Sequence, residues 1–382
     1  MKAKAQERLD RARDDLVELS HRIHAHPELK FEEEQASSWL AALLSDNGFA
    51  VERGAYDLPT AFVARAGSGP LHIAICAEYD ALPAIGHACG HNIIATAAAG
   101  AGIAAAEVAD EAGLTVTVFG TPGEEGGGGK ILLLERGAFE HEHAAMMVHP
   151  APMDILEPMM IAVAAMDVQY TGKEAHASAA PQQGINAADA LTVAQVAIGL
   201  LRQHIRSTDR VHGIVTKGGD ARNIVPAHTT AEYAVRARTL DQLGDMQEKV
   251  RRCFEAGALA TGAKLEIKEG KPYAQMVHDT DIAAAYRANA ETLGRTFFDG
   301  GSAVDRSGGS TDMGNVSLAM PSIHPMIGIN SLPAGNHQPE FAEHCATKDA
   351  DQAVYDGALA MAWTAIDIAG DDALRERLLS RT

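Results

Sequence analysis

Apolar runs of strand length alternate with helical segments between residues 71 and 149, and this alternation constrains the fold of the 382-residue chain most strongly. The runs predicted as buried strands are 71–77, 114–120 and 144–148, and the helices between them cover about 92–112 and 130–136. Strand and helix in strict alternation are typical of a doubly wound α/β sheet with parallel strands. Functional side chains of such sheets gather at the carboxyl ends of the strands.

The pattern changes between residues 161 and 271. Strands are predicted at 165–171, 211–216, 229–236 and 264–268, and helices at 185–205 and 240–261. This βαββαβ order is typical of a ferredoxin-like α+β sandwich. We therefore expect residues 161–271 to form a domain that is inserted into a first domain made of residues 1–160 and 272–382.

Composition narrows the range of partners. The hydrophobic content of 46% is sufficient for two cores, and 32 basic residues against 51 acidic ones give a net charge of -19. Such a charge disfavours binding to nucleic acid or to an anionic membrane surface. The charged first residues, the lack of an apolar run of roughly 18 residues and four scattered cysteines predict a cytoplasmic protein without a membrane segment.

Residues suited to bind metal follow several of the predicted strands. Cys89 and His91 flank a glycine, and both side chains are good zinc ligands. Glu125, His149 and His337 are further candidates, which makes five ligands. Five are too many for one tetrahedral ion and suit a dinuclear site, so we predict two divalent ions. A thiolate favours Zn, whereas carboxylate and imidazole also accept Mn, so Zn and Mn both remain open.

A dinuclear site predicts hydrolytic chemistry. Two ions polarise a carbonyl group and lower the pKa of a shared water to near neutrality, so that hydroxide is available. Adjacent side chains do not point at one ion together, so we assign Glu125 as the ligand and Glu124 as the general base. Asp80, which precedes the Cys89 turn, is expected to orient an imidazole. The histidines at 21, 24 and 26 lack a completing thiol or carboxylate, and we do not assign them to a site.

Seven segments together resemble the M20 metallopeptidase family, in particular its amidohydrolase branch and, within it, the M20 domain-containing 2 and aminobenzoyl-glutamate hydrolase group. They are L-S-H-R-I-H-A-H-P-E at 19–28, E-Y-D-A-L-P at 78–83, G-H-A-C-G-H-N at 86–92, T-P-G-E-E-G at 121–126, H-P at 149–150, G-K-E-A-H-A-S at 172–178 and N-I-V-P at 223–226. The match covers nearly the whole chain in order. It implies a mixed-to-parallel catalytic sheet of zinc-peptidase type with an inserted lid and dimerisation domain, and hence a homodimer.

The resemblance also implies roles for individual residues. It matches the five candidate ligands to metal-binding positions and Glu124 to the catalytic base. His176 matches a histidine that polarises the scissile carbonyl, either in its own chain or across a dimer. Asn223 and Arg236 match positions that hold a substrate carboxylate, although the alternation of a strand leaves Arg238 as an alternative to Arg236. The chain departs from many members of the branch in having Asn92 where they have Asp.

Two further positions, Glu78 and Thr311, lie close in sequence to the candidate site residues or among them. Glu78 stands where the aminopeptidase branches have a histidine ligand, a role that the resemblance gives to Cys89. Thr311 lies in a glycine-rich loop over 300–314 and either binds substrate or only forms a turn.

These observations predict a metal-dependent amidohydrolase. Its substrate would be a small N-acyl amino acid, a dipeptide or an aryl-amide conjugate that carries a free carboxylate. One alternative is a protein of the same fold that keeps the metal and binds a ligand without catalysis, and another is a purely structural metal site. The acyl group and the amino acid of the substrate are not determined by these patterns.

Overall fold

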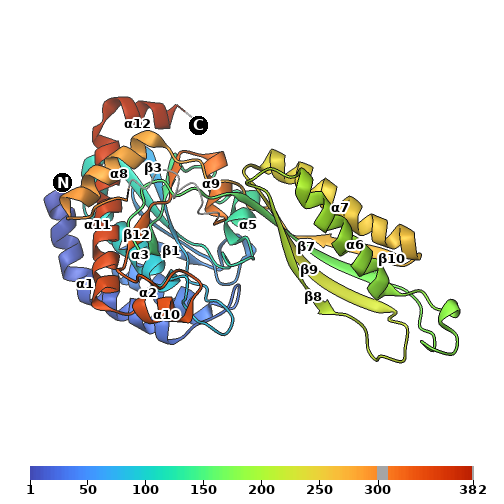
Figure 1. Ribbon diagram of the computed structural model, residues 1–382. Helices are drawn as coiled ribbons and strands as arrows, with labels where there is room; N and C mark the ends of the chain where they lie inside the picture. The colour runs from blue at the N-terminus through green and yellow to red at the C-terminus, as the bar shows by residue number, and fades with distance from the viewer. Residues whose placement is uncertain (299–308, 381–382) are drawn as a thin grey trace. The chain divides into compact units, whose positions relative to one another are not determined.

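The computed structural model describes residues 1–298 and 309–380 (Figure 1). The chain divides into two compact units. The first comprises residues 1–159, 276–307 and 315–382, and the second comprises residues 160–275 and 308–314. Part of the predicted loop over 300–314, up to residue 308, lies outside the described residues.

A six-stranded sheet in the order β1-β2-β4-β3-β5-β11 forms the centre of the first unit. Its strands are β1 (Ala50–Arg53), β2 (Phe62–Gly67), β3 (Leu71–Ala77), β4 (Leu114–Gly120), β5 (Ala144–Met146) and β11 (Ser322–Ile323). β3 pairs in parallel with β4 and β5, and β11 pairs in parallel with β5, whereas β2 is antiparallel to β1 and β4. This mixed α/β sheet confirms the predicted fold class.

One helix, α3 (His91–Ala106), forms the core of the helical layer. Its residues from His91 to Ala105 are buried, because it packs against α1 (Lys2–Ala25), α11 (Lys348–Gly370) and the strands β3 and β4. The remaining helices are α2 (Glu34–Asp46), α4 (Ala109–Ala112), α5 (Gly129–Glu135), α8 (Thr280–Thr292), α9 (Met313–Ala319), α10 (Pro339–His344) and α12 (Asp372–Leu379). An alanine-rich, small-residue helix is required here because neighbouring backbones approach closely on every side.

The region around His149 differs from the sequence-based expectation. The predicted strand over 144–148 ends at residue 146, and His149 begins a separate strand, β6 (His149–Ala151). β6 pairs in parallel with β12 (Met326–Gly328) in a two-stranded sheet. His149 therefore lies at the beginning of a strand and not at the end of one.

The second unit has the predicted βαββαβ order. Its elements are β7 (Ala162–Thr171), α6 (Ala187–Leu201), β8 (Arg210–Lys217), β9 (His228–Ala237), α7 (Leu240–Thr261) and β10 (Lys264–Glu269). The strands form an antiparallel sheet in the order β10-β7-β9-β8. Buried residues alternate along β7 and β9, as expected for strands with one face against the two helices.

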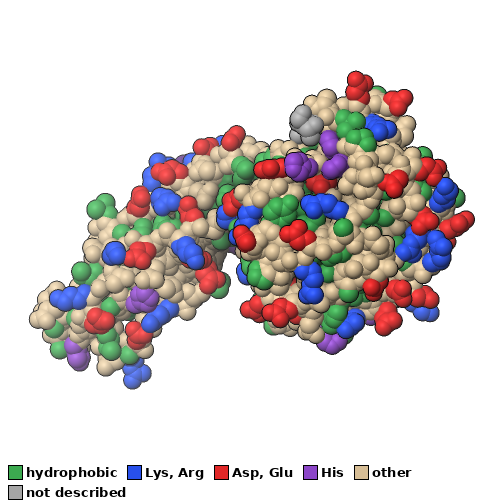
Figure 2. Space-filling view, turned by 180° about the vertical axis from the view of Figure 1, so that it is seen from behind, with side chains coloured by type: hydrophobic (Ala, Val, Ile, Leu, Met, Phe, Trp, Pro, Cys, Tyr) green, Lys and Arg blue, Asp and Glu red, His purple; other side chains and the backbone are tan. Residues whose placement is uncertain are grey.

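Across residues 1–298 and 309–380, no helix combines the length and apolar content needed to cross a bilayer. On the face drawn in Figure 2, acidic and basic side chains are interspersed. The predicted cytoplasmic location stays a prediction.

Candidate metal centre and active site

The turn from Cys89 to His91 places a thiol and an imidazole at the beginning of α3. Gly90 between them has a φ of +82°, and a Cβ added there would lie 2.4 Å from Cγ of Pro150. Only glycine fits a backbone that is both left-handed and this close to a neighbouring chain segment. Cys89 and His91 on either side of it are both buried.

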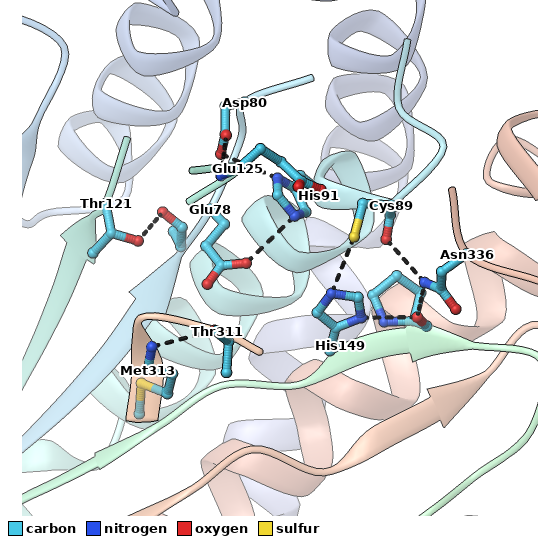
Figure 3. Close-up of polar contacts among 12 residues, drawn as sticks. Glu78, Asp80, Cys89, His91, Thr121, Glu125, His149, Thr311, Met313 and Asn336 are labelled. Atoms are coloured by element: carbon cyan, nitrogen blue, oxygen red, sulfur yellow. Dashed lines mark hydrogen bonds and ion pairs between the residues drawn. The ribbon is translucent and has the colours of Figure 1, made fainter. Parts of the chain in front are cut away.

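His149 faces this thiol. Its Nε2 lies 3.4 Å from Sγ of Cys89 (Figure 3). Its Nδ1 lies 2.9 Å from the carbonyl oxygen of Pro150, and because a carbonyl only accepts, Nδ1 carries the proton. Burial lowers the pKa of His149 to about 4, since a charged ring would lose its hydration. The ring is therefore neutral at physiological pH and presents a lone pair on Nε2 toward Cys89.

Asp80 holds two parts of the site together. Its Oδ1 lies 3.1 Å from Nδ1 of His91, and its Oδ2 accepts a hydrogen bond of 2.9 Å from the backbone N–H of Glu125. Burial alone would raise the pKa of Asp80, but His91 and the backbone N–H groups of Glu125 and Glu124 hold it below its usual value. The ionised carboxylate keeps the proton of His91 on Nδ1, so that Nε2 is available to a metal.

The late segment with His337 is tied to the same turn. The backbone N–H of His337 donates to the carbonyl of Ala88 at 2.8 Å, and the side-chain amide of Asn336 donates to the carbonyl of Pro150 at 3.0 Å. Nε2 of His337 lies 3.2 Å from Oε1 of Glu125. A residue more than 200 positions downstream is thereby brought to the predicted ligand Glu125.

The ligand atoms gather in three groups, each with all of its atoms within 4.8 Å of one another. The groups are Cys89, His91 and His149; Cys89, Glu125 and His337; and Glu78, His91 and Glu124. The five residues predicted as ligands make up the first two groups, which have Cys89 in common. The general base predicted from the sequence, Glu124, belongs to the third.

The geometry of these groups fits divalent cations. Two ligand atoms on one tetrahedral zinc ion, with bonds of about 2.0 to 2.3 Å, lie about 3.3 to 3.6 Å from each other. The separations of 3.4 Å between Cys89 and His149 and 3.2 Å between Glu125 and His337 are close to this range. Nε2 of His91 is buried without a hydrogen-bond partner in the described part of the chain, a costly arrangement that a cation would relieve.

Two residues near the site, Glu33 and His324, were not predicted from the sequence to have a role. Oε1 of the buried Glu33 accepts a hydrogen bond of 2.8 Å from the backbone N–H of Gly123, directly before Glu124. His324 is fully buried, with its ring centroid 5.4 Å from that of His149. A glutamate beside a helix and a histidine before a proline carry no distinctive pattern, so only the three-dimensional structure identifies them.

The predicted substrate-binding residues lie in the second unit. His176 forms a β-bridge with Ile224, and the N–H of Ala177 donates to the carbonyl of Asn223 at 3.0 Å, so the segments of His176 and Asn223 are adjacent. Arg236 on β9 donates from Nη1 to Oγ of Ser310 at 3.0 Å. This contact places Arg236 beside the segment that contains Thr311.

Thr311 itself is buried, and its Oγ1 accepts a hydrogen bond of 3.2 Å from the backbone N–H of Met313. This contact is typical of a turn. The substrate-binding roles of His176, Asn223, Arg236 and Thr311 stay predictions.

A mixed α/β sheet that carries clustered thiol, imidazole and carboxylate ligands, together with a separate ferredoxin-like unit, is the architecture of a two-domain metallopeptidase. The sequence profile described as "Peptidase dimerisation domain" of the M20 family matches residues 162–261. The Xaa-Arg dipeptidase of Mus musculus is 38% identical over 394 residues, covering 98% of this chain and 90% of that protein. The chain belongs to the M20 peptidase family, and it is an amidohydrolase or peptidase of that family.

Other relatives agree with this assignment. A p-aminobenzoyl-glutamate hydrolase of Escherichia coli (strain K12) is 33% identical over a region that covers 68% of this chain and 58% of that protein. A dinuclear metal-binding peptidase of the M20 family from Bacillus subtilis has a similar fold, with a TM-score of 0.70, 22% identity and coverage of 94% of this chain and 99% of that one. The predicted resemblance to the M20 family is therefore confirmed.

Proposed function

We propose that this protein is a metal-dependent dipeptidase or related amidohydrolase that cleaves the amide bond of a small substrate with a free carboxylate. The observation that carries the proposal is the convergence of ligand-type side chains from distant segments beside Glu124. The residues that would hold two divalent ions, Zn or Mn, are Cys89, His91, Glu125, His149 and His337. When bound, the ions supply Lewis acidity that polarises the amide carbonyl and acidifies water.

The chain's own residues then handle the proton. Glu124 is buried next to the ligands, and its carboxylate takes a proton from the attacking water and returns it to the leaving amine. Asp80 keeps the His91 proton on Nδ1, and the carbonyl of Pro150 does the same for His149. Each of these contacts engages Nδ1 and thereby directs Nε2 of the ring toward the other candidate ligands.

The relatives suggest which amides to test first. One relative is a dipeptidase that acts on Xaa-Arg and covers nearly the whole chain, and a second is a p-aminobenzoyl-glutamate hydrolase. Dipeptides with a carboxyl-terminal arginine are therefore the first substrates to test, followed by aryl amides of glutamate and N-acyl amino acids. Asn223 and Arg236 are proposed to hold the substrate carboxylate, and His176 to polarise the scissile carbonyl.

The decisive experiment measures release of free amino acid from this panel by the metal-loaded protein. The Glu124→Gln variant should lose about 100- to 10,000-fold in kcat while it retains its metal, because only proton transfer is removed. Glu140→Gln, a change at an exposed carboxylate, is the matched control and should keep full activity. Equal turnover by Glu124→Gln and the control would rule out the assigned base. No turnover of any amide by metal-loaded protein would favour the ligand-binding alternative.

We also propose that the second unit forms a homodimer. The profile match to a dimerisation domain supports this proposal. β8 is an edge strand of its sheet and exposes apolar side chains, with Ile214 63% and Val215 44% accessible. An exposed, apolar edge strand is suited to pair with a second copy. Light scattering after gel filtration should give twice the 40.2 kDa chain mass, and Ile214→Lys should shift the protein toward monomer.

A further inference from the structure

A buried ion pair lies at the carboxyl end of β3, directly beside the predicted ligands. Nζ of Lys130, near the beginning of α5, lies 2.5 Å from Oε1 of Glu78, and both side chains are 0% exposed. Removing two charges from water is costly, and a buried pair often stabilises a protein no more than apolar residues would. This pair therefore calls for an explanation other than stability.

The second oxygen of Glu78 points at the metal-binding face of His91. Oε2 lies 3.6 Å from Nε2 of His91, and Figure 3 shows the Glu78 carboxylate directed toward this ring. The other nitrogen of His91 is already bonded to Asp80. Neither Oε2 of Glu78 nor Nε2 of His91 has a hydrogen-bond partner in residues 1–298 and 309–380. Two buried polar atoms thus face each other, too far apart for a good hydrogen bond.

This separation of 3.6 Å is close to the one between two ligands of a single ion. A carboxylate oxygen and an imidazole nitrogen, each about 2.1 Å from a tetrahedral ion, lie about 3.4 Å apart. We propose that Glu78 is an additional ligand of the metal centre, which binds through Oε2 the ion that His91 also holds. Lys130 is then a positioning residue, because its ammonium group occupies Oε1 and leaves only Oε2 available. The inference rests on the proposed metal-dependent function.

The test measures metal content and affinity, not activity. Full-length wild type, Glu78→Gln and Lys130→Met are loaded with zinc, dialysed against chelators of graded strength and measured by mass spectrometry. Wild type should retain two ions per chain. Glu78→Gln should bind one of them more than 100-fold more weakly, and Lys130→Met should show a loss of about 10- to 100-fold, the usual effect of a group that orients a ligand. Glu142→Gln, a change at a buried carboxylate outside the three ligand groups, is the matched control and should retain two ions with wild-type affinity.

A second measurement reports on coordination directly. In the cobalt-substituted protein, the visible absorption of the ion changes with the number and type of its ligands, so Glu78→Gln should alter the spectrum whereas Glu142→Gln should not. If Glu78→Gln does not fold, Glu78→Asp keeps the charge beside Lys130 but shortens the side chain, and it should show the same loss of affinity. Two tightly bound ions and an unchanged cobalt spectrum in folded Glu78→Gln or Glu78→Asp would overturn the inference. Wild type that binds no metal would instead overturn the proposed function.

Discussion

The Asp80→Asn substitution tests whether the tautomer of His91 controls metal binding. Asp80 accepts hydrogen bonds from Nδ1 of His91 at 3.1 Å and from the backbone N–H of Glu125 at 2.9 Å. An asparagine of the same shape has one acceptor and one donor end. If its oxygen accepts from Glu125, its amide group faces Nδ1 of His91 and forces the ring proton to Nε2. If the asparagine amide is flipped, its NH2 group faces the backbone N–H of Glu125, and two donors oppose each other.

Both orientations weaken the metal site without removing a ligand. In the first, Nε2 carries a proton and must lose it before it coordinates, and in the second the segment of Glu125 is displaced. Loss of a group that orients a histidine ligand typically lowers metal affinity about 10- to 100-fold, or about 1.4 to 2.7 kcal/mol. The expected result for Asp80→Asn is an affinity loss in this range, with kcat reduced in addition at saturating metal.

Competition with a chromophoric chelator measures this affinity, and thermal unfolding of the metal-free protein checks that the fold is intact. Asp154→Asn is the matched control, because Asp154 also accepts a backbone hydrogen bond, from Gly328 at 2.8 Å, but belongs to none of the ligand groups. An Asp80→Asn protein with wild-type zinc affinity would show that Asp80 does not set the tautomer of His91.

Three further changes have defined outcomes. Gly90→Ala places a Cβ atom on a left-handed backbone and 2.4 Å from Cγ of Pro150. The free energy of unfolding should therefore fall by roughly 2 to 5 kcal/mol, with a lower Tm in thermal unfolding. A Tm equal to that of wild type would refute the close approach. Glu33→Ala removes the acceptor for the N–H of Gly123, so it should cost about 1 to 3 kcal/mol and reduce kcat by displacing the catalytic turn; unchanged kcat and Tm would contradict this role. Burial raises the pKa of Glu142 to about 7, above its unfolded value, so its contribution to stability is present below about pH 4.5 and is lost as the pH rises through 7. The difference in free energy of unfolding between Glu142→Gln and wild type, measured by denaturant titration, should therefore favour the variant more at pH 8 than at pH 4.5. The same difference at both pH values would exclude a shifted pKa.

The sequence predicted the main elements of the fold because their local patterns and their tertiary environment agree. The strands at 71–77 and 114–120 have the predicted bounds, since each is a mainly apolar run of strand length that ends at a polar or glycine residue. The ferredoxin-like order was equally clear, because alternating strands and amphipathic helices carry distinct periods. In contrast, β1 and β2 were missed, since their antiparallel pairing depends on contacts with β4 that no local pattern encodes.

For the site, the candidate ligands could be predicted from the sequence, but the groups that orient them could not. The five candidate ligands could be predicted because thiol, imidazole and carboxylate side chains are the usual ligands of zinc. The structure brings these five together in two overlapping groups: Cys89, His91 and His149, and Cys89, Glu125 and His337. Their hydrogen-bond partners were harder to identify. A backbone carbonyl such as that of Pro150 fixes a tautomer without leaving any trace in the sequence. The sequence therefore indicates the candidate ligands, whereas only the structure shows which groups orient them.

Lys130 illustrates why the supporting groups of a site escape sequence analysis. A lysine after four glycines at the beginning of a short helix is expected to be solvated, yet it is fully buried against Glu78. The positive charge offsets that of Glu78, whose carboxylate belongs to the same ligand group as Glu124. Without such a cation, two carboxylates of one ligand group would repel each other with no positive charge beside them. The same charge that makes this lysine costly to bury therefore offsets the negative charge of the glutamate that we propose as a ligand.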